Sequence, residues 1–250
     1  MNATPYSIKK MSPGEILDTS ILVFRDNLSA LLGIAFVVHG TSYGIALSFG
    51  LGDLFSLDSS LTGFAFHWPQ VLALLAMTAL APLGTLVSTK VIAERYLGRR
   101  VRVANAVLNA VKLSPALLLA LMASGLLTFF GYMLLIIPGI FVSLKLILVY
   151  PALVVERRGG ISSMERSWKL TRGSIVKLMI LYLVSLYPAF ICGGLLFLFL
   201  GQGVGMDVAV QVLSGVMTAF LTVMLTVTYF ERRCEKEAFD MQLLAQSFED

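Results

Sequence analysis

Residues 134–173, LLIIPGIFVSLKLILVYPALVVERRGGISSMERSWKLTRG, decide the fold class of this chain. The stretch starts with an apolar run, meets the pair Pro138-Gly139, and continues as a second apolar run. It then ends in Glu156-Arg157-Arg158 and passes into a basic segment. An apolar helix of about 20 residues spans the roughly 30 Å hydrocarbon core of a bilayer. The pattern therefore predicts a membrane hairpin, turning at Pro138-Gly139, followed by a helix at the membrane surface.

The composition extends this prediction to the whole chain. Hydrophobic residues make up 57% of the 250 residues, charged residues only 14%, and the mean hydropathy is +0.85. In soluble domains roughly a quarter of the residues are charged. We therefore predict an all-α, polytopic membrane protein that forms a single domain over residues 1–250. Six spans are expected, at residues 29–51, 71–93, 115–137, 140–155, 175–200 and 208–229.

The distribution of Lys and Arg predicts the orientation of these spans. Cytoplasmic loops of membrane proteins are enriched in both residues. With six spans and both termini in the cytoplasm, every Lys and Arg falls on the cytoplasmic side except Lys145. We expect Lys145 to lie in the fourth span, close enough to the outer surface for its ammonium group to reach it.

Each pair of spans is preceded by a segment with the pattern of an amphipathic helix. The first begins at Ser12-Pro13-Gly14-Glu15, which has the residues of a capping box with proline at the first helical position. The second is Val103–Leu113, and the third begins at Ser162-Ser163-Met164-Glu165, a further capping box, with Met164 and Trp168 on its apolar side. The expected architecture is three hairpins, each preceded by a cytoplasmic-side amphipathic helix. The three units are either true repeats or similar only in pattern.

A polar stripe in the membrane is the first candidate site. His39 lies in the middle of the first span, where a polar side chain needs a partner. On the sixth span, polar residues recur at intervals of three and four. One interpretation is a hydrated cavity or substrate path between these spans, and the other is hydrogen bonding that only holds the helices together. The candidate residues are His39, Gln211, Ser214, Thr218 and Thr222.

The basic cytoplasmic segment is the second candidate site. Lys and Arg side chains near a membrane surface attract anionic lipid head groups. The alternative is that these residues only fix the topology and anchor the helix at the interface. Glu156 and Glu165 are expected to pair with basic neighbours or to cap the helix. The candidate head-group residues are Arg157, Arg158, Arg166, Trp168, Lys169 and Arg172.

No enzymatic motif is present. The only histidines, His39 and His67, are expected at different depths, so we expect no metal site and no cofactor. The net charge of +4 is explained by the cytoplasmic excess of Lys and Arg, so no nucleic-acid partner is expected. The expected partners are membrane lipids, with anionic lipids favoured, and a membrane protein or second copy that contacts the GxxxG pattern of residues 40–44.

Motifs along nearly the whole chain resemble one known family. They are Gly14-Glu15-Ile16-Leu17-Asp18, Ile137-Pro138-Gly139-Ile140, Pro151-Ala152 with Glu156, Ser167 with Leu170 and Gly173, Tyr229-Phe230, and Glu237-Ala238-Phe239-Asp240. The chain resembles the glycerophosphoryl diester phosphodiesterase membrane domain, a six-helix family of bacterial and archaeal membrane proteins. The resemblance implies that architecture and a location in the prokaryotic cytoplasmic (inner) membrane. It implies no catalytic residue, because the phosphodiesterase activity of fused members belongs to a separate soluble barrel. Ala238 departs from the pattern, which has glycine at that position.

Two functions of different classes remain open from the sequence. The first is lipid or amphiphile handling, or an accessory role in envelope homeostasis, which the basic segments and the polar stripe favour. The second is a membrane scaffold or interaction subunit that transports nothing. An intramembrane enzyme is the least favoured class, because His, Asp and Glu do not cluster in the spans.

Overall fold

The computed structural model describes residues 9–49, 51, 68–99, 102–201 and 203–237. All the regular secondary structure in these ranges is α-helical. Six helical segments are long and apolar enough to cross a membrane, with α5 and α6 together forming one of them. The helices are α1 Pro13–Asp26, α2 Leu28–Ser48, α3 Trp68–Tyr96, α4 Val103–Leu134, α5 Ile136–Leu146, α6 Val149–Glu156, α7 Gly160–Thr171, α8 Ile175–Leu200 and α9 Val204–Glu237.

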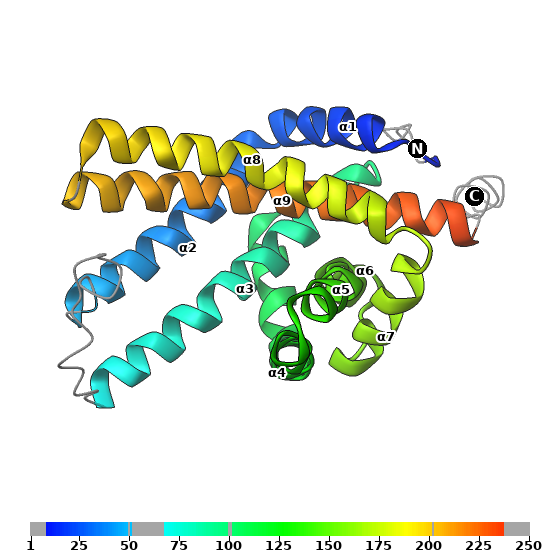
Figure 1. Ribbon diagram of the computed structural model, residues 1–250, viewed down its shortest axis with the longest axis horizontal. Coiled ribbons are helices and arrows are strands. Elements are labelled where there is room, and N and C mark those ends of the chain that lie inside the picture. The colour runs from blue at the N-terminus through cyan, green and yellow to red at the C-terminus, as the bar shows by residue number, and fades with distance from the viewer. Residues whose placement is uncertain (1–8, 50, 52–67, 100–101, 202, 238–250) are drawn as a thin grey trace.

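Helix α9 is the centre of the bundle. It packs against α1, α2, α3, α6, α7 and α8. Figure 1 shows α8 and α9 side by side, with α2 and α3 inclined to them and α4 and α5 viewed nearly end-on. The start of α1 and the end of α9 lie at the same side of the molecule. The largest buried side chains include Tyr96, Tyr229 and Phe230, and the rings of Tyr96 and Phe230 stack with centroids 5.2 Å apart.

The first predicted capping box is confirmed. The Ser12 hydroxyl accepts a hydrogen bond from the Glu15 backbone N–H at 3.3 Å, and the Glu15 carboxylate accepts one from the Ser12 N–H at 2.7 Å. That backbone N–H, together with Lys9, lowers the pKa of Glu15 to about 2. Helix α1 buries Ile16, Ser20 and Val23 on one face. The chain then starts α2 after a single intervening residue, Asn27.

The predicted break before the third span is wrong. Helix α4 runs without interruption from Val103 to Leu134 and includes both the predicted amphipathic segment and the predicted span. Proline in a helix leaves the carbonyl four residues earlier without its usual donor. Here the Ser114 hydroxyl donates to the Val111 carbonyl at 2.7 Å, so the partner that Pro115 cannot provide is replaced. The pattern of helix, break and span thus occurs before α2 and before α8, but not here.

The turn of the central hairpin lies earlier than predicted. Leu135, with φ −169° and ψ 158°, separates α4 from α5, and Pro138 lies in the first turn of α5. A first-turn residue needs no N–H donor, so proline is tolerated there. Gly139 is the point of close approach, because a Cβ on Gly131 would lie 3.1 Å from its Cα. The proline–glycine pair therefore starts the second helix and packs it against the first.

The predicted fourth span is broken in the middle. Helix α5 ends at Leu146 and α6 begins at Val149. Pro151 explains this break, because it has no N–H for the Ile147 carbonyl and its ring would clash with that carbonyl. Ser167 of α7 stabilises the break: its hydroxyl donates to the Lys145 carbonyl at 2.7 Å and accepts from the Leu148 N–H at 3.2 Å.

Replacing Ser167 by alanine is expected to destabilise the protein. The substitution takes the Ser167 hydroxyl from the buried Leu148 N–H, and an unsatisfied buried group costs about 1–3 kcal/mol, whereas the Lys145 carbonyl still accepts from the Thr171 hydroxyl at 3.4 Å. We expect a fall of about 2 kcal/mol in stability, measured as a lower melting temperature of the detergent-solubilised protein. Ser162→Ala is the matched control, because the Ser162 hydroxyl donates to the Gly159 carbonyl at the start of its own helix and, among the described residues, bridges to no other helix. Equal effects of the two substitutions would contradict a special role for Ser167.

Helix α7 differs from its prediction in start and in buried face. It begins at Gly160 with Gly159 as N-cap, so the predicted capping box from Ser162 to Glu165 is wrong. Its buried face consists mostly of small residues, whereas Trp168 is exposed. Small side chains allow close contact between helices. Helix α7 therefore packs into the bundle, against α4, α5, α6 and α9. The buried residues are Gly160, Ser163, Ser167, Leu170 and Thr171.

Candidate functional site

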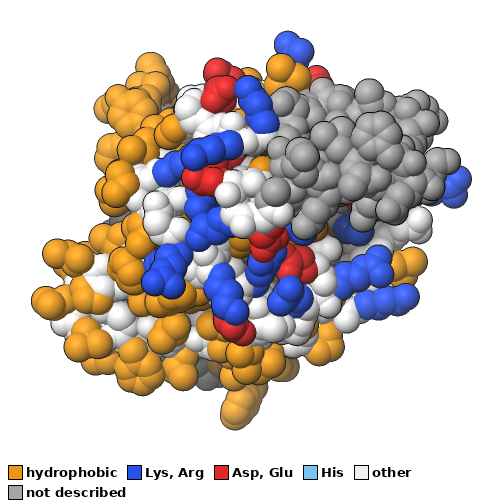
Figure 2. All heavy atoms as spheres, turned by 90° about the vertical axis from the view of Figure 1, so that its right-hand side faces the viewer, with side chains coloured by type: hydrophobic (Ala, Val, Ile, Leu, Met, Phe, Trp, Pro, Cys, Tyr) orange, Lys and Arg blue, Asp and Glu red, His pale blue; other side chains and the backbone are white. Residues whose placement is uncertain are grey.

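Charged side chains gather on one face of the molecule. Figure 2 shows Lys, Arg, Asp and Glu side chains near the middle of this face, with hydrophobic side chains along its left and lower edges. Ion pairs among the described residues include Lys177–Glu231 at 2.8 Å and Lys10–Glu235 at 2.9 Å. A charged centre with an apolar margin is the distribution expected where a membrane protein passes from lipid into water.

Arg166 is the centre of a buried ion network. Its Nε donates to Glu156 at 2.6 Å, and its two terminal nitrogens donate to the two carboxylate oxygens of Glu237. The Tyr229 hydroxyl donates to the same Glu156 oxygen at 2.5 Å. Glu237 first, and Glu156 after it, raise the pKa of Arg166 above its ordinary value, although burial acts in the opposite direction. The network joins α6, α7 and α9, and it confirms that Glu156 pairs with basic neighbours.

The predicted head-group residues differ in exposure and in the partners that they contact. Arg166 has only 13% of its side chain exposed and is occupied by two carboxylates. Arg158 pairs with Glu156 at 2.5 Å, and Lys169 pairs with Glu165 at 2.6 Å. Arg157 has a left-handed backbone at the end of α6 and lines a narrow cavity with Lys90 and Asn109. Arg172 and Trp168 are exposed.

The predicted position of Lys145 near the outer surface is wrong. The residue is only 4% exposed and packs against α7. Its Nζ lies 5.4 Å from the centroid of the Phe141 ring and 5.6 Å from that of Trp168. The break at residues 147–148 explains the error, because it ends α5 where α7 packs on it. Lys145 is therefore buried beside α7 and does not reach a surface.

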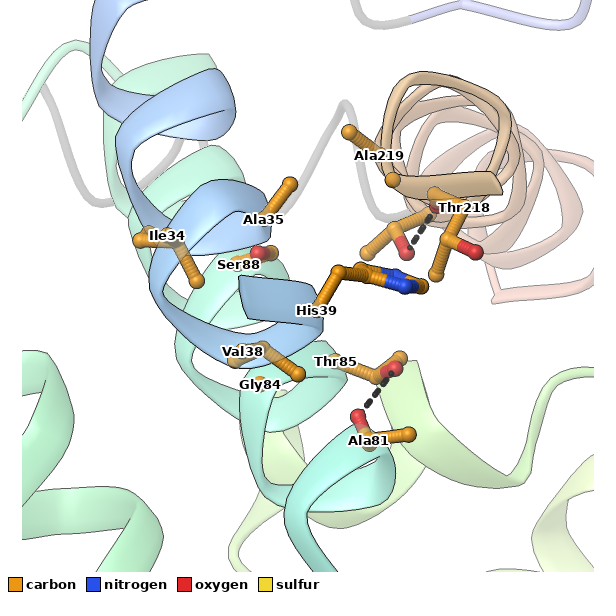
Figure 3. Close-up of a pocket in the computed structure, with 12 residues that line it drawn as sticks. Ile34, Ala35, Val38, His39, Ala81, Gly84, Thr85, Ser88, Thr218 and Ala219 are labelled. Atoms are coloured by element: carbon orange, nitrogen blue, oxygen red, sulfur yellow. Dashed lines mark hydrogen bonds between the residues drawn. The ribbon is translucent and has the colours of Figure 1, made fainter. Parts of the chain in front are cut away.

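His39 does lie in a cavity between helices. Figure 3 shows its ring directed from α2 toward Thr218 of α9, with Thr85 and Ser88 of α3 nearby. Its Nδ1 lies 3.5 Å from the Gln211 amide oxygen. The cavity has a volume of about 60 Å³. That is room for about two water molecules at about 30 Å³ each, so the space fits water and not a lipid.

The polar stripe of α9 is only partly assembled around this cavity. Thr218 and Thr222 line it, Gln211 reaches it through His39, and Ser214 is not among its lining residues. The hydroxyls of Thr222 and Thr226 donate to carbonyls four residues earlier in α9, each at 2.7 Å. Gly215 allows α9 to approach α2 closely, because a Cβ at Gly215 would lie 3.3 Å from the His39 ring. This geometry favours helix–helix contact over a substrate path.

A larger groove lies between α4, α5 and α6. Its volume is about 500 Å³, within the range of about 300–1,000 Å³ common for small-molecule sites. Most of its lining is apolar, and Ser124, Thr128, Ser143 and Tyr150 add hydroxyl groups. Phe129 and Tyr132, at its margin, are exposed. The groove suits an apolar chain with one polar end.

Reasoning from the sequence missed three contributors to this region. Tyr229, Glu237 and Ser167 belong to the motifs that resemble the known family, but the sequence alone assigns none of them a contact or a function. Their partners lie far away in the sequence, so no local pattern indicates the pairing. Pro151 is the signal in the sequence, because a proline in an apolar run predicts a helix break. The backbone groups freed at that break need hydrogen bonds from another segment.

The fold and this charged face define the class of protein: a multi-pass α-helical membrane protein. Within the residues that the structure describes, no group of three or more His, Cys, Asp or Glu is placed to hold a metal ion.

Comparison with known proteins agrees with this class. A 72-residue stretch is 43% identical to a Photorhabdus laumondii protein named UPF0259 membrane protein. The match covers 27% of this chain and 28% of that protein, so the chain spans well under a third of its relative. No family model matches the chain, and no solved structure matches it. The likeness to the phosphodiesterase membrane domain therefore stays a resemblance of motifs.

Proposed function

We propose that the chain resides in the prokaryotic cytoplasmic membrane with both termini in the cytoplasm. Two observations support this orientation. The start of α1 and the end of α9 lie at the same side of the molecule (Figure 1), and Lys and Arg side chains gather on that side (Figure 2). In this arrangement α1 and α7 are the cytoplasmic-side amphipathic helices. The hairpins are α2–α3, α4 with the broken pair α5–α6, and α8–α9.

The proposed role is lipid or amphiphile handling, as an accessory factor in envelope homeostasis. The groove between α4, α5 and α6 carries this proposal, because its volume and lining suit an acyl chain. Phe129, Tyr132 and the neighbouring α4 residues expose apolar side chains beside it, as lipid-facing residues do. The role requires no chemical step by the chain and no cofactor.

A membrane scaffold is the second candidate. On α2, Gly40 and Gly44 have no other helix within 4 Å of the position a Cβ would take. Small residues on a helix surface permit close packing of another helix, from a partner protein or a second copy. The small volume at His39 also favours a role without transport.

Lipid retention separates the two candidates. The protein is extracted from membranes with a mild detergent, and native mass spectrometry identifies what stays bound. We expect retained phospholipid in which anionic species are enriched relative to the parent membrane. A lipid-free protein would contradict lipid handling and leave the scaffold as the better account.

A further inference from the structure

Lys145 is a buried cation whose ammonium group has no hydrogen bond and no ion pair with any residue that the structure describes. The nearest groups are the aromatic faces of Phe141 and Trp168. Two ring contacts at 5.4 and 5.6 Å attract a cation but do not neutralise its charge. Buried charges are normally paired, so this position calls for an anion.

The surroundings of Lys145 add positive charge. Arg172, at the end of α7, acts on Lys145 electrostatically. Lys236, near the end of α9, is in turn repelled by Arg232, Lys145 and Arg172. Helix α7 contacts both α5 and α9, which places the helices of residues 145, 172 and 236 next to one another although these residues are far apart in the sequence.

Two carboxylates near Lys236 in the described part of the chain are already engaged. Glu235 binds Lys10 and Arg232, and Glu237 binds Arg166. Lys236 donates to the Lys169 carbonyl, a neutral group, at 2.8 Å. Arg172 and Lys236 are both exposed, so these two side chains can be reached from outside.

We propose that Lys145, Arg172 and Lys236 form a binding site for a phosphate group, with Trp168 at its edge. Lysine binds phosphate as a point charge, and arginine adds a planar set of donors. Such a phosphate comes either from a lipid head group or from free phosphate in solution. The inference rests on the proposed lipid role and names the part of the ligand that the cytoplasmic side recognises.

Trp168 provides the readout, because its ring is close to the Lys145 ammonium group. The chain has two tryptophans, so the substitution Trp68→Phe leaves Trp168 as the single tryptophan, whose fluorescence is excited selectively over that of tyrosine. In that background the detergent-solubilised protein is titrated with short-chain phosphatidylglycerol, with short-chain phosphatidylcholine and with inorganic phosphate. We expect a saturable change with phosphatidylglycerol and a weak one with phosphatidylcholine. If inorganic phosphate also gives a saturable change, the natural ligand is free phosphate. If inorganic phosphate gives no such change, the phosphate group belongs to a lipid.

Three variants test the residues. Lys145→Met keeps the buried volume and is expected to weaken phosphatidylglycerol binding about tenfold, the loss of one charge-assisted contact. Arg172→Gln changes an exposed side chain, so folding is preserved, and is expected to weaken binding about fivefold. Lys112→Met, another exposed lysine, is the control and should leave binding unchanged.

Two results would overturn the inference. One is wild-type affinity in Lys145→Met, and the other is an equal loss in Lys112→Met, which would indicate only general attraction by net charge. If the parent protein retains phospholipid on extraction while Lys145→Met still binds normally, the phosphate site is wrong and the lipid role stands. If the parent protein retains no phospholipid and gives no titration, both are wrong.

Discussion

Replacement of Gly160 by alanine is expected to loosen the contact between α7 and α4 and to lower stability by about 3 kcal/mol. A Cβ at this position would lie 2.4 Å from the Ala116 carbonyl oxygen and 2.8 Å from the Ala120 nitrogen. Both are backbone atoms of α4, so no side-chain rotation relieves the clash. The whole of α7 must move, and with it the residues that hold the Lys145 region.

The neighbouring glycine provides the control. At Gly159 the nearest atom to an added Cβ is the Ser162 hydroxyl oxygen at 3.7 Å, and φ is −65°. Gly159→Ala should therefore change stability by no more than about 1 kcal/mol, the cost of a poorer N-cap. Melting temperatures in detergent compare the two variants, and Gly160→Ala should also weaken phosphatidylglycerol binding. Equal melting temperatures for the two variants would show that α7 does not pack as described.

Replacement of Arg166 by methionine is expected to have the second large effect. The substitution leaves Glu156 and Glu237 without their shared cation in a mostly buried position. Removing one partner of a buried pair costs about 3–5 kcal/mol of stability. Because Glu237 is partly exposed, we expect a loss at the lower end, about 3 kcal/mol. For a chain of this length that is a fall of about 6–12 °C in melting temperature.

Arg158 is the matched control for this experiment, because it pairs with the same carboxylate. Its side chain is 48% exposed, so Arg158→Gln should cost less than about 1 kcal/mol. Adding Glu237→Gln to the Arg166→Met variant should recover part of the loss, because it removes the charge of one of the two carboxylates that have lost Arg166. If the Arg158 and Arg166 variants melt at the same temperature, the buried network is not what holds α6, α7 and α9 together.

Features that depend on local sequence are predictable here. The capping box at Ser12 and Glu15 involves residues three apart, and the structure forms it as expected. The class follows from the length and polarity of the apolar runs, and most observed helix ends lie within a few residues of the predicted spans. These features depend on the bilayer thickness and on short-range hydrogen bonding, and neither depends on the tertiary structure.

Features that depend on distant partners were not predictable. The helix around Pro115 continues because Ser114 satisfies one carbonyl, whereas the helix around Pro151 breaks because Ser167 of α7 stabilises the break. The same residue type thus has opposite outcomes: a neighbouring hydroxyl supports the continuous helix at Pro115, whereas a contact from another helix stabilises the break near Pro151. The error over Lys145 also comes from a distant partner, because the position of Lys145 depends on where α7 packs.

A structure of the protein in phosphatidylglycerol-containing nanodiscs tests the central claim most directly, namely that this membrane protein binds a lipid phosphate where α7 covers the α5–α6 break. We predict head-group density between Lys145, Arg172 and Lys236, on the side of the molecule that carries the start of α1. Ordered lipid elsewhere around the helices, with α7 in place and no density at Lys145, would contradict the claim.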